Sequence, residues 1–141
     1  MATTTATITL NSADLTDNNL SISNTATLTT AGTDTGITET TGLARVKTST
    51  GSNTVLLDFG LTSGVAQDVT ADKSAKVYIK NVNDRGDGTK YVDILIKTRE
   101  IGRLYGGDWM FIPWSGGSGE DIEYTASDTT ETTLEYCVFY E

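Results

Sequence analysis

The chain has 141 residues and a formal net charge of −9, from 10 basic and 19 acidic side chains. It has no histidine and one cysteine, Cys137, which excludes imidazole catalysis, an internal disulfide and zinc sites built from cysteine and histidine. The 27 threonines and 10 serines favour strands, because β-branched threonine is poor in helices and fits a pleated surface. The acidic balance disfavours a nucleic-acid partner, since lysine and arginine hold phosphates.

Alternating side chains predict two strands at the start of the chain. Ile8 and Leu10 alternate with threonines, and residues 20–28 repeat this pattern from Leu20 and Ile22 onward. The same faces make these four apolar side chains candidates for contacts with another subunit.

The next stretch, residues 29–42, has few bulky apolar groups and predicts a loop. Residues 1–42 therefore have two interpretations. They belong to one β-sandwich domain that spans residues 1–141, or they form an extended arm or strand-exchange segment attached to it.

Two hairpins are expected in the middle of the chain. A glycine-bearing turn separates residues 43–48 from residues 54–59, and these two strands are expected to pair. Residues 75–80 and 91–97 carry matching apolar rows, and the loop at residues 83–89 is expected to join them as a second hairpin.

The last third of the chain adds further short strands around glycine-bearing turns, at 100–105, 109–113, 121–124 and 132–140. The total is about eight to ten strands at even spacing. This spacing predicts an all-β fold, namely a single-domain antiparallel β-sandwich or a jelly-roll or barrel-like fold.

No pattern of catalytic residues stands out. Without histidine, a serine or threonine nucleophile needs another base, and no local motif supplies one. The loop from Asn83 to Gly88 resembles an acidic calcium loop, but Arg85 falls where an oxygen ligand is required. The tripeptide from Arg85 to Asp87 matches the string that integrin ligands display, yet glycine and aspartate are also what a turn favours. A hydrolase with a pair of carboxylates, as in glycosidases, needs no histidine and stays an alternative, although any acidic β-protein supplies many such pairs by chance. We expect a non-enzymatic protein with no catalytic residue, cofactor or metal.

No stretch of the sequence indicates a membrane partner. The apolar runs are far shorter than the roughly 20 residues of a spanning helix. The first residues lack the basic and apolar regions of a signal peptide, so we expect synthesis in a host cytoplasm.

The most informative strand is apolar on both faces. Trp109 and Phe111 point to one side, while Met110, Ile112 and Trp114 point to the other. Both faces must then be covered. A loop of the same chain, a second subunit, or a sugar ring stacked on a tryptophan would each do so, and we expect Trp109, Phe111 and Trp114 to include interface residues.

Charge is unevenly distributed along the sequence. Residues 1–44 carry four acids and no base, residues 45–103 carry ten bases and seven acids, and residues 104–141 carry eight acids and no base. A basic middle between acidic ends favours association of subunits in register, although solvation of exposed strand faces explains the same pattern.

Three stretches resemble small virion structural proteins of marine tailed bacteriophages, cyanophages in particular. They are the threonine-rich opening from Ala2 to Leu10, the segment from Glu100 to Trp114, and the aromatic ending from Tyr136 to Glu141. Only the segment from Glu100 to Trp114 is distinctive as a motif. The size is most similar to that of a capsid decoration, or cement, protein.

The resemblance implies a β-rich structural protein on the virion, with the outer capsid surface favoured over the tail. Its expected partners are the major capsid protein, other virion proteins and further copies of itself, a trimer being one arrangement. The alternative is a tail- or fibre-associated adsorption protein that binds carbohydrate through Trp109 or Trp114. The resemblance transfers no catalytic or metal residue.

Overall fold

The computed structural model describes residues 3–12, 20–29, 39–48, 52–59, 66–67, 75–86, 90–115, 119–127 and 132–140. Chain contacts divide the protein into two units, residues 1–38 and residues 39–141. We describe each unit by itself. The boundary lies close to the end of the arm that the sequence suggests at residue 42.

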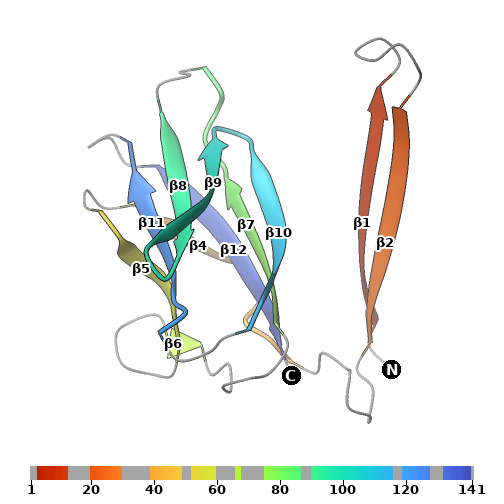
Figure 1. The fold of residues 1–141 in the computed structure, drawn as a ribbon, viewed down its shortest axis with the longest axis horizontal. Coiled ribbons are helices and arrows are strands. Elements are labelled where there is room, and N and C mark those ends of the chain that lie inside the picture. The colour runs from red at the N-terminus through yellow and green to blue at the C-terminus, as the bar shows by residue number, and fades with distance from the viewer. Residues whose placement is uncertain are drawn as a thin grey trace. The chain divides into compact units, whose positions relative to one another are not determined.

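The described residues form twelve strands, of which β3 and β6 have only two residues each (Figure 1). In chain order they are β1 (Thr3–Ser12), β2 (Leu20–Thr29), β3 (Glu39–Thr40), β4 (Ala44–Lys47), β5 (Thr54–Phe59), β6 (Ala66–Gln67), β7 (Ala75–Asn81), β8 (Tyr91–Ile96), β9 (Arg99–Tyr105), β10 (Trp109–Trp114), β11 (Ile122–Ala126) and β12 (Thr133–Tyr140).

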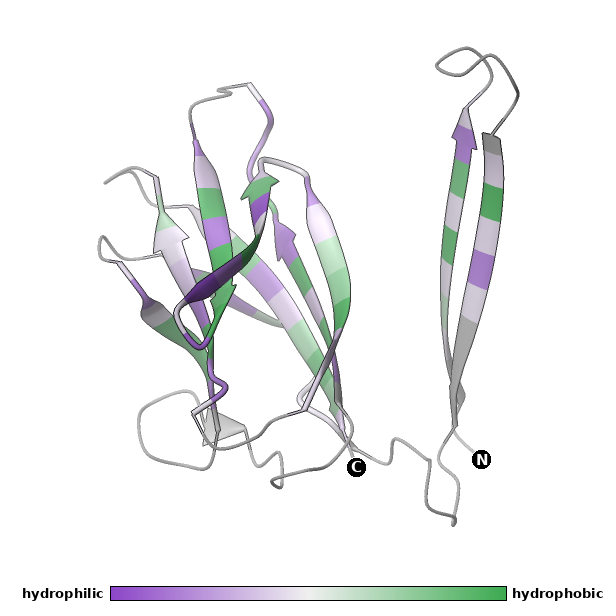
Figure 2. Ribbon diagram, viewed as in Figure 1, coloured by the Kyte–Doolittle hydropathy of each residue, from purple (hydrophilic) through white to green (hydrophobic). Residues whose placement is uncertain are grey.

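The first unit is an antiparallel hairpin of β1 and β2. Its register is unbroken over all ten residues of each strand, from the pair Thr3 and Thr29 to the pair Ser12 and Leu20. Both strands alternate apolar with polar residues, as the hydropathy colours along β1 show (Figure 2). This alternation gives the hairpin one apolar and one hydroxyl-rich face.

The second unit is a sandwich of two five-stranded sheets. One sheet has the order β10-β7-β12-β3, with β4 pairing β12 beside β3, and the other has the order β6-β5-β11-β8-β9. All pairs in the described residues are antiparallel except that of β5 with β6. The prediction of an all-β antiparallel sandwich is confirmed.

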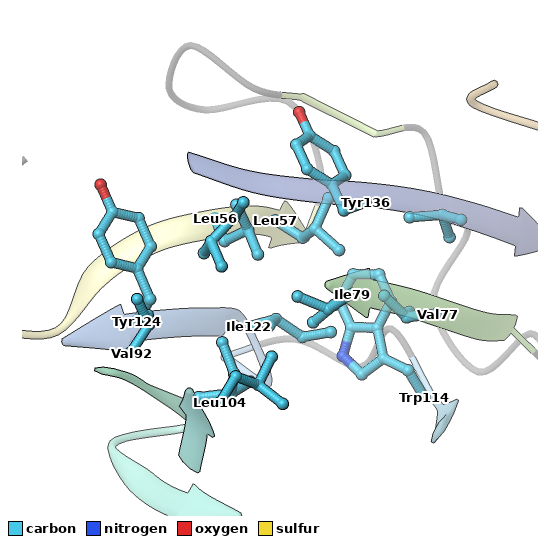
Figure 3. Close-up of a cluster of buried hydrophobic side chains, with 13 residues drawn as sticks. Leu56, Leu57, Val77, Ile79, Val92, Leu104, Trp114, Ile122, Tyr124 and Tyr136 are labelled. Carbon is cyan, nitrogen blue, oxygen red and sulfur yellow. The ribbon is translucent and has the colours of Figure 1, made fainter. Parts of the chain in front are cut away.

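The inner faces of the two sheets enclose one hydrophobic core (Figure 3). Strict alternation along β7 and β12 sends every second side chain into it, whereas the other sheet contributes from β5, β8, β9 and β11. The buried cluster consists of Leu56, Leu57, Val77, Ile79, Val92, Ile94, Leu104, Trp114, Ile122, Tyr124, Leu134, Tyr136 and Val138. Every member of this cluster belongs to the second unit.

The predictions of two hairpins in the middle of the chain are both wrong. Strand β4 pairs with β12 while β5 pairs with β11 in the opposite sheet. Likewise β7 pairs with β10 and β12, whereas β8 pairs with β9 and β11. An apolar row records only that one face of a strand is buried. Strands that face each other across a sandwich therefore carry the same pattern as strands that pair.

A true two-residue hairpin joins β8 and β9 without the usual glycine. Lys97 and Thr98 both have positive φ, 50° and 63°, which side chains other than glycine, asparagine or aspartate seldom adopt. Two contacts from β11 and the residue before it hold this turn. The Lys97 amide donates to the Asp121 carbonyl at 3.2 Å, and the Thr98 amide donates to a carboxylate oxygen of Glu123 at 3.0 Å.

Candidate interaction surfaces

The apolar face of the N-terminal hairpin is exposed. Ile8, Leu10 and Ile22 are 39%, 53% and 47% exposed, and Leu10 and Ile22 are directly paired in the register. Leu20, the fourth apolar residue singled out in this region, lies at the register position opposite Ser12. The structure thus brings Ile8, Leu10 and Ile22 to one face. A two-stranded hairpin is marginally stable by itself in water, so this face needs a cover.

The opposite face of the hairpin carries hydroxyl and amide side chains. The hydroxyls of Thr7 and Thr25 lie 3.2 Å apart, and the Ser21 hydroxyl donates to the Asn11 side-chain oxygen at 3.0 Å. These cross-strand hydrogen bonds support the pairing without apolar contact. The two faces therefore differ in chemistry, one being polar and the other apolar and exposed.

Strand β10 differs from the hairpin strands, because both of its faces are apolar. Trp114 is buried, and Met110 and Ile112 pack against the core beside it, while Trp109 is 50% exposed and Phe111 half-buried. The alternation predicted for this strand is present. The core of the same chain covers one face, and the other face lies on the outside of the sandwich.

Trp114 is a core residue in this structure and not part of an exposed surface. Its side chain is only 4% exposed, and it packs near Val77 and Ile79 (Figure 3). Its indole N–H donates to the carbonyl oxygen of Glu120 at 2.7 Å. The prediction of Trp114 as an interface residue is wrong, because the alternation of side chains along β10 places Trp114 in the core of the sandwich.

The register defines what accompanies Trp109 on the outside of its sheet. Reading across β10, β7, β12 and β4, Trp109 lies opposite Lys80, Lys80 opposite Glu135, and Glu135 opposite Arg45. In the next row Phe111 of β10 lies opposite Tyr78 of β7 and Cys137 of β12. We call the face formed by these rows, together with Lys47, Lys76, Pro113 and Phe139, the outer face of the β10 sheet.

Two aromatic rings form a platform on this outer face. The ring centroids of Tyr78 and Trp109 are 6.5 Å apart and their planes are inclined by 37°. Tyr78 is diagonal to Trp109 across the strand pair, a separation that large side chains bridge. Tyr78 and Lys80 are not among the interface residues that the sequence predicts. Their alternation with Val77 and Ile79 was the available signal that they share a face.

Glu135 is held in this face by two neighbours. Its carboxylate accepts a hydrogen bond from the Arg45 side-chain Nε at 2.8 Å and one from the Tyr78 hydroxyl at 3.5 Å. Burial, followed by the charge and hydrogen bond of Glu135, raises the pKa of the Tyr78 hydroxyl above its ordinary value. The charge of Glu135 is therefore engaged within the protein.

Basic side chains dominate the outer face of the β10 sheet. Among the described residues, four bases lie on this face against the single acid Glu135, namely Arg45, Lys47, Lys76 and Lys80. The chain as a whole has a net charge of −9. This face therefore has the opposite sign to the protein that carries it.

Aromatic side chains on the other sheet are not available in the same way. The Arg103 guanidinium lies 3.7 Å from the centre of the Tyr91 ring and pairs with Asp93 at 2.6 Å. Tyr91 also makes an edge contact with Tyr105 at 5.7 Å. The Arg103 guanidinium already covers the Tyr91 ring, whereas Trp109 is half exposed.

The loop after β7 has a structural role. Arg85 pairs with Asp108 at 3.1 Å, and the side-chain oxygen of Asn83 accepts a hydrogen bond from the Thr133 amide at 3.1 Å. Asp87, the last residue of the integrin-like tripeptide, lies outside the described residues, as does Gly88. In the part of the chain that the structure describes, no group of three or more acidic or cysteine side chains is placed to hold a metal ion.

Among the residues with described structure, no helix has the length and apolar character to cross a membrane. Comparison with known proteins adds no family: neither a protein-family model nor a curated protein matches the chain.

Proposed function

We propose that the protein is a non-enzymatic structural protein of a phage virion, which decorates and stabilises the outer capsid surface through subunit–subunit and subunit–capsid contacts. The exposed apolar face of the N-terminal hairpin is the observation that carries this proposal. Ile8, Leu10 and Ile22 are all exposed on one face of a two-stranded hairpin, and such a face suits packing against a neighbouring subunit.

The charge of the hairpin supports packing against protein. Strands β1 and β2 contain no acidic or basic residue, although the chain carries 29 of them. Copies with a net charge of −9 repel one another overall, and contact through an uncharged strip adds no like-charge pair to that repulsion. The resemblance of the sequence to small virion proteins supports the same conclusion.

The first test replaces apolar side chains of the hairpin without changing its strand propensity. We expect the triple variant Ile8→Thr, Leu10→Thr and Ile22→Thr to reduce both self-association, measured by light scattering after gel filtration, and incorporation into virions, measured by quantitative mass spectrometry of purified particles. The matched control changes the opposite face, with Thr7→Ser, Thr9→Ser and Ser23→Thr, and should leave both quantities unchanged.

Deletion of residues 1–12 is the stronger version of the same test. The proposed role of the hairpin is wrong if this deletion leaves virion incorporation and oligomeric state unaltered. Imaging of labelled protein on virions tests location separately. Label on the head surface supports decoration, whereas label confined to tail or fibres contradicts it.

The second candidate, a tail- or fibre-associated adsorption protein, is favoured by one observation. Trp109 presents half of its side chain on the outside of the sandwich, next to a second aromatic ring. Trp114 is buried, so any carbohydrate contact of this kind involves Trp109.

A further inference from the structure

We propose that the outer face of the β10 sheet binds an anionic polysaccharide, with Trp109 as the stacking platform and Lys80 as the nearest cation. The inference rests on this sheet face alone and holds for a location on either head or tail. Compared with the carbohydrate-binding alternative above, it names Trp109 as the tryptophan involved and restricts the ligand to anionic glycans.

The first argument is the state of the Trp109 ring. A half-exposed indole on a sheet face offers a flat π surface, and the C–H faces of a sugar ring suit such a surface because the face of an aromatic ring is electron-rich. Tyr78 extends the platform at 6.5 Å between ring centroids. The inclination of 37° gives a chain ligand two adjacent surfaces rather than one.

The second argument is charge. Lys80 lies directly opposite Trp109 in the register, which places the two β-carbons about 5 Å apart. Glu135, on the other side of Lys80, is already engaged by Arg45 at 2.7 Å and by the Tyr78 hydroxyl. A carboxylate or sulfate on a sugar stacked over Trp109 therefore lies within reach of an ammonium group, on a face of opposite sign to the whole chain.

The third argument separates a glycan from an acidic polypeptide. An extended peptide binds a sheet by adding a strand to an open edge, where its backbone pairs. In the described residues β10 has β7 as its sheet neighbour on one side only, but its exposed edge contains Pro113, which has no N–H to donate. The aromatic and basic side chains lie on the face of this sheet and not along its edge, which favours a ligand that stacks.

The test measures binding of the purified full-length chain to three polymers, by isothermal titration calorimetry and by affinity electrophoresis. The polymers are polygalacturonate as the anionic glycan, dextran as the neutral glycan and poly-L-glutamate as the acidic polypeptide. We expect polygalacturonate to bind best, with an affinity that falls as salt rises from 50 to 500 mM, since salt screens exposed charges.

Variants then separate stacking from charge. Trp109→Ala should weaken polygalacturonate binding roughly ten-fold, while Trp109→Phe, which keeps a ring, should retain most of it. Lys80→Gln should weaken binding several-fold and reduce its salt dependence. The matched controls lie on the other sheet and its β8–β9 turn. Ile101→Ala removes an exposed apolar side chain there, Lys97→Gln removes an exposed base, and both should bind as the parent does.

Each contrary result overturns the proposal. Absence of polygalacturonate binding does so directly. If dextran binds as tightly as polygalacturonate, charge has no role in binding. If poly-L-glutamate binds as tightly as polygalacturonate and Trp109→Ala has no effect, the ligand is an acidic polypeptide and not a glycan. If Trp109→Ala loses its folded circular-dichroism signal, its loss of binding says nothing about stacking, and Lys80→Gln becomes the deciding variant. Unchanged polygalacturonate binding by Lys80→Gln would then contradict the proposal.

Discussion

The side-chain amide of Asn81 in β7 donates a hydrogen bond of 3.1 Å to the carbonyl oxygen of Leu104 in β9, and so connects the two sheets of the sandwich. Asn81 is only 1% exposed, and its side-chain oxygen accepts a second bond from the Asn83 amide at 3.2 Å. One polar side chain of β7 thus satisfies main-chain groups of β9 and of the loop that follows β7.

Replacing Asn81 by leucine should destabilise the protein strongly. The variant Asn81→Leu keeps the branched shape of the side chain but removes the hydrogen bonds to the Leu104 carbonyl and from the Asn83 amide, which costs about 2 to 4 kcal/mol in the free energy of unfolding. Urea denaturation measures this loss. The exposed neighbour Asp84 provides the control, since Asp84→Ala should change stability by less than about 0.5 kcal/mol. A similar effect of both substitutions would contradict the bridging role.

Gly106 should not tolerate alanine, for a steric reason. A β-carbon on Gly106 would overlap the backbone of Asp84 and lie 2.8 Å from the Asn83 carbonyl oxygen. Backbone has to move to relieve this contact, and we expect Gly106→Ala to cost about 2 kcal/mol or more. The matched control is Gly86→Ala, because a β-carbon there meets no heavy atom within 4 Å. Thermal melts of the two variants should differ by several degrees, and equal melting temperatures would refute the close approach.

Trp109 and Trp114 should differ in how strongly acrylamide quenches their fluorescence and in how much their replacement lowers the free energy of unfolding. Trp114→Phe removes a buried ring that donates to the Glu120 carbonyl, so it should lower the free energy of unfolding by about 2 to 3 kcal/mol. Trp109→Phe should have little effect on stability, since half of that side chain is exposed. Acrylamide should quench the Trp109 emission that remains in Trp114→Phe more strongly than the Trp114 emission in Trp109→Phe. The reverse order would show that the inward and outward faces of β10 are exchanged.

Two tyrosines should titrate later than an ordinary phenol. Burial raises the pKa of Tyr136 and is also the largest cause for Tyr78, to which the Glu135 charge adds. Because these folded-state pKa values exceed that of the unfolded chain, near 10, the unfolded state loses its protons first. The stability contributed by both hydroxyls is therefore complete below pH 10 and falls as the pH rises through the raised values.

Ultraviolet titration at 295 nm separates the two phenols. Glu135→Gln should lower the pKa of Tyr78 toward 10 while leaving that of Tyr136 in place, and Tyr78→Phe should remove one late-titrating group. If Glu135→Gln moved both phenols equally, a general loosening of the fold and not the local charge would explain the shift.

Period-two alternation was enough to predict the all-β class and most strand positions, because burial of one face is a local property of a strand. Partner choice was not predictable in the same way. Residues 43–48 and 54–59 are close in sequence, but β12 supplies a partner for the first and β11 for the second. These partners come from distant parts of the chain, so the residues of a short sequence segment do not indicate which strand it pairs with.

The candidate surfaces were predictable in part. Alternation around Ile8 and Ile22 was enough to predict the apolar face of the hairpin. The two apolar faces of β10 were enough to mark Trp109 as a candidate. Whether Trp109 or Trp114 faced outward depended on which side the sandwich core lay, which the strand itself does not encode. The turn at Lys97 and Thr98 was hidden because its residues lack the usual turn chemistry, and tertiary contacts with β11 and its start hold it instead.

In the role proposed for the hairpin, its lack of charge constrains how a partner subunit recognises it. With no ion pair available in β1 or β2, alignment must come from the spacing of the side chains themselves. A slip of one residue would present threonines where Ile8 and Leu10 had been, and a slip of two would preserve chemistry while shortening the overlap. The proposed partner would then be selected by the length and periodicity of its own apolar surface, which has to match strands of ten residues.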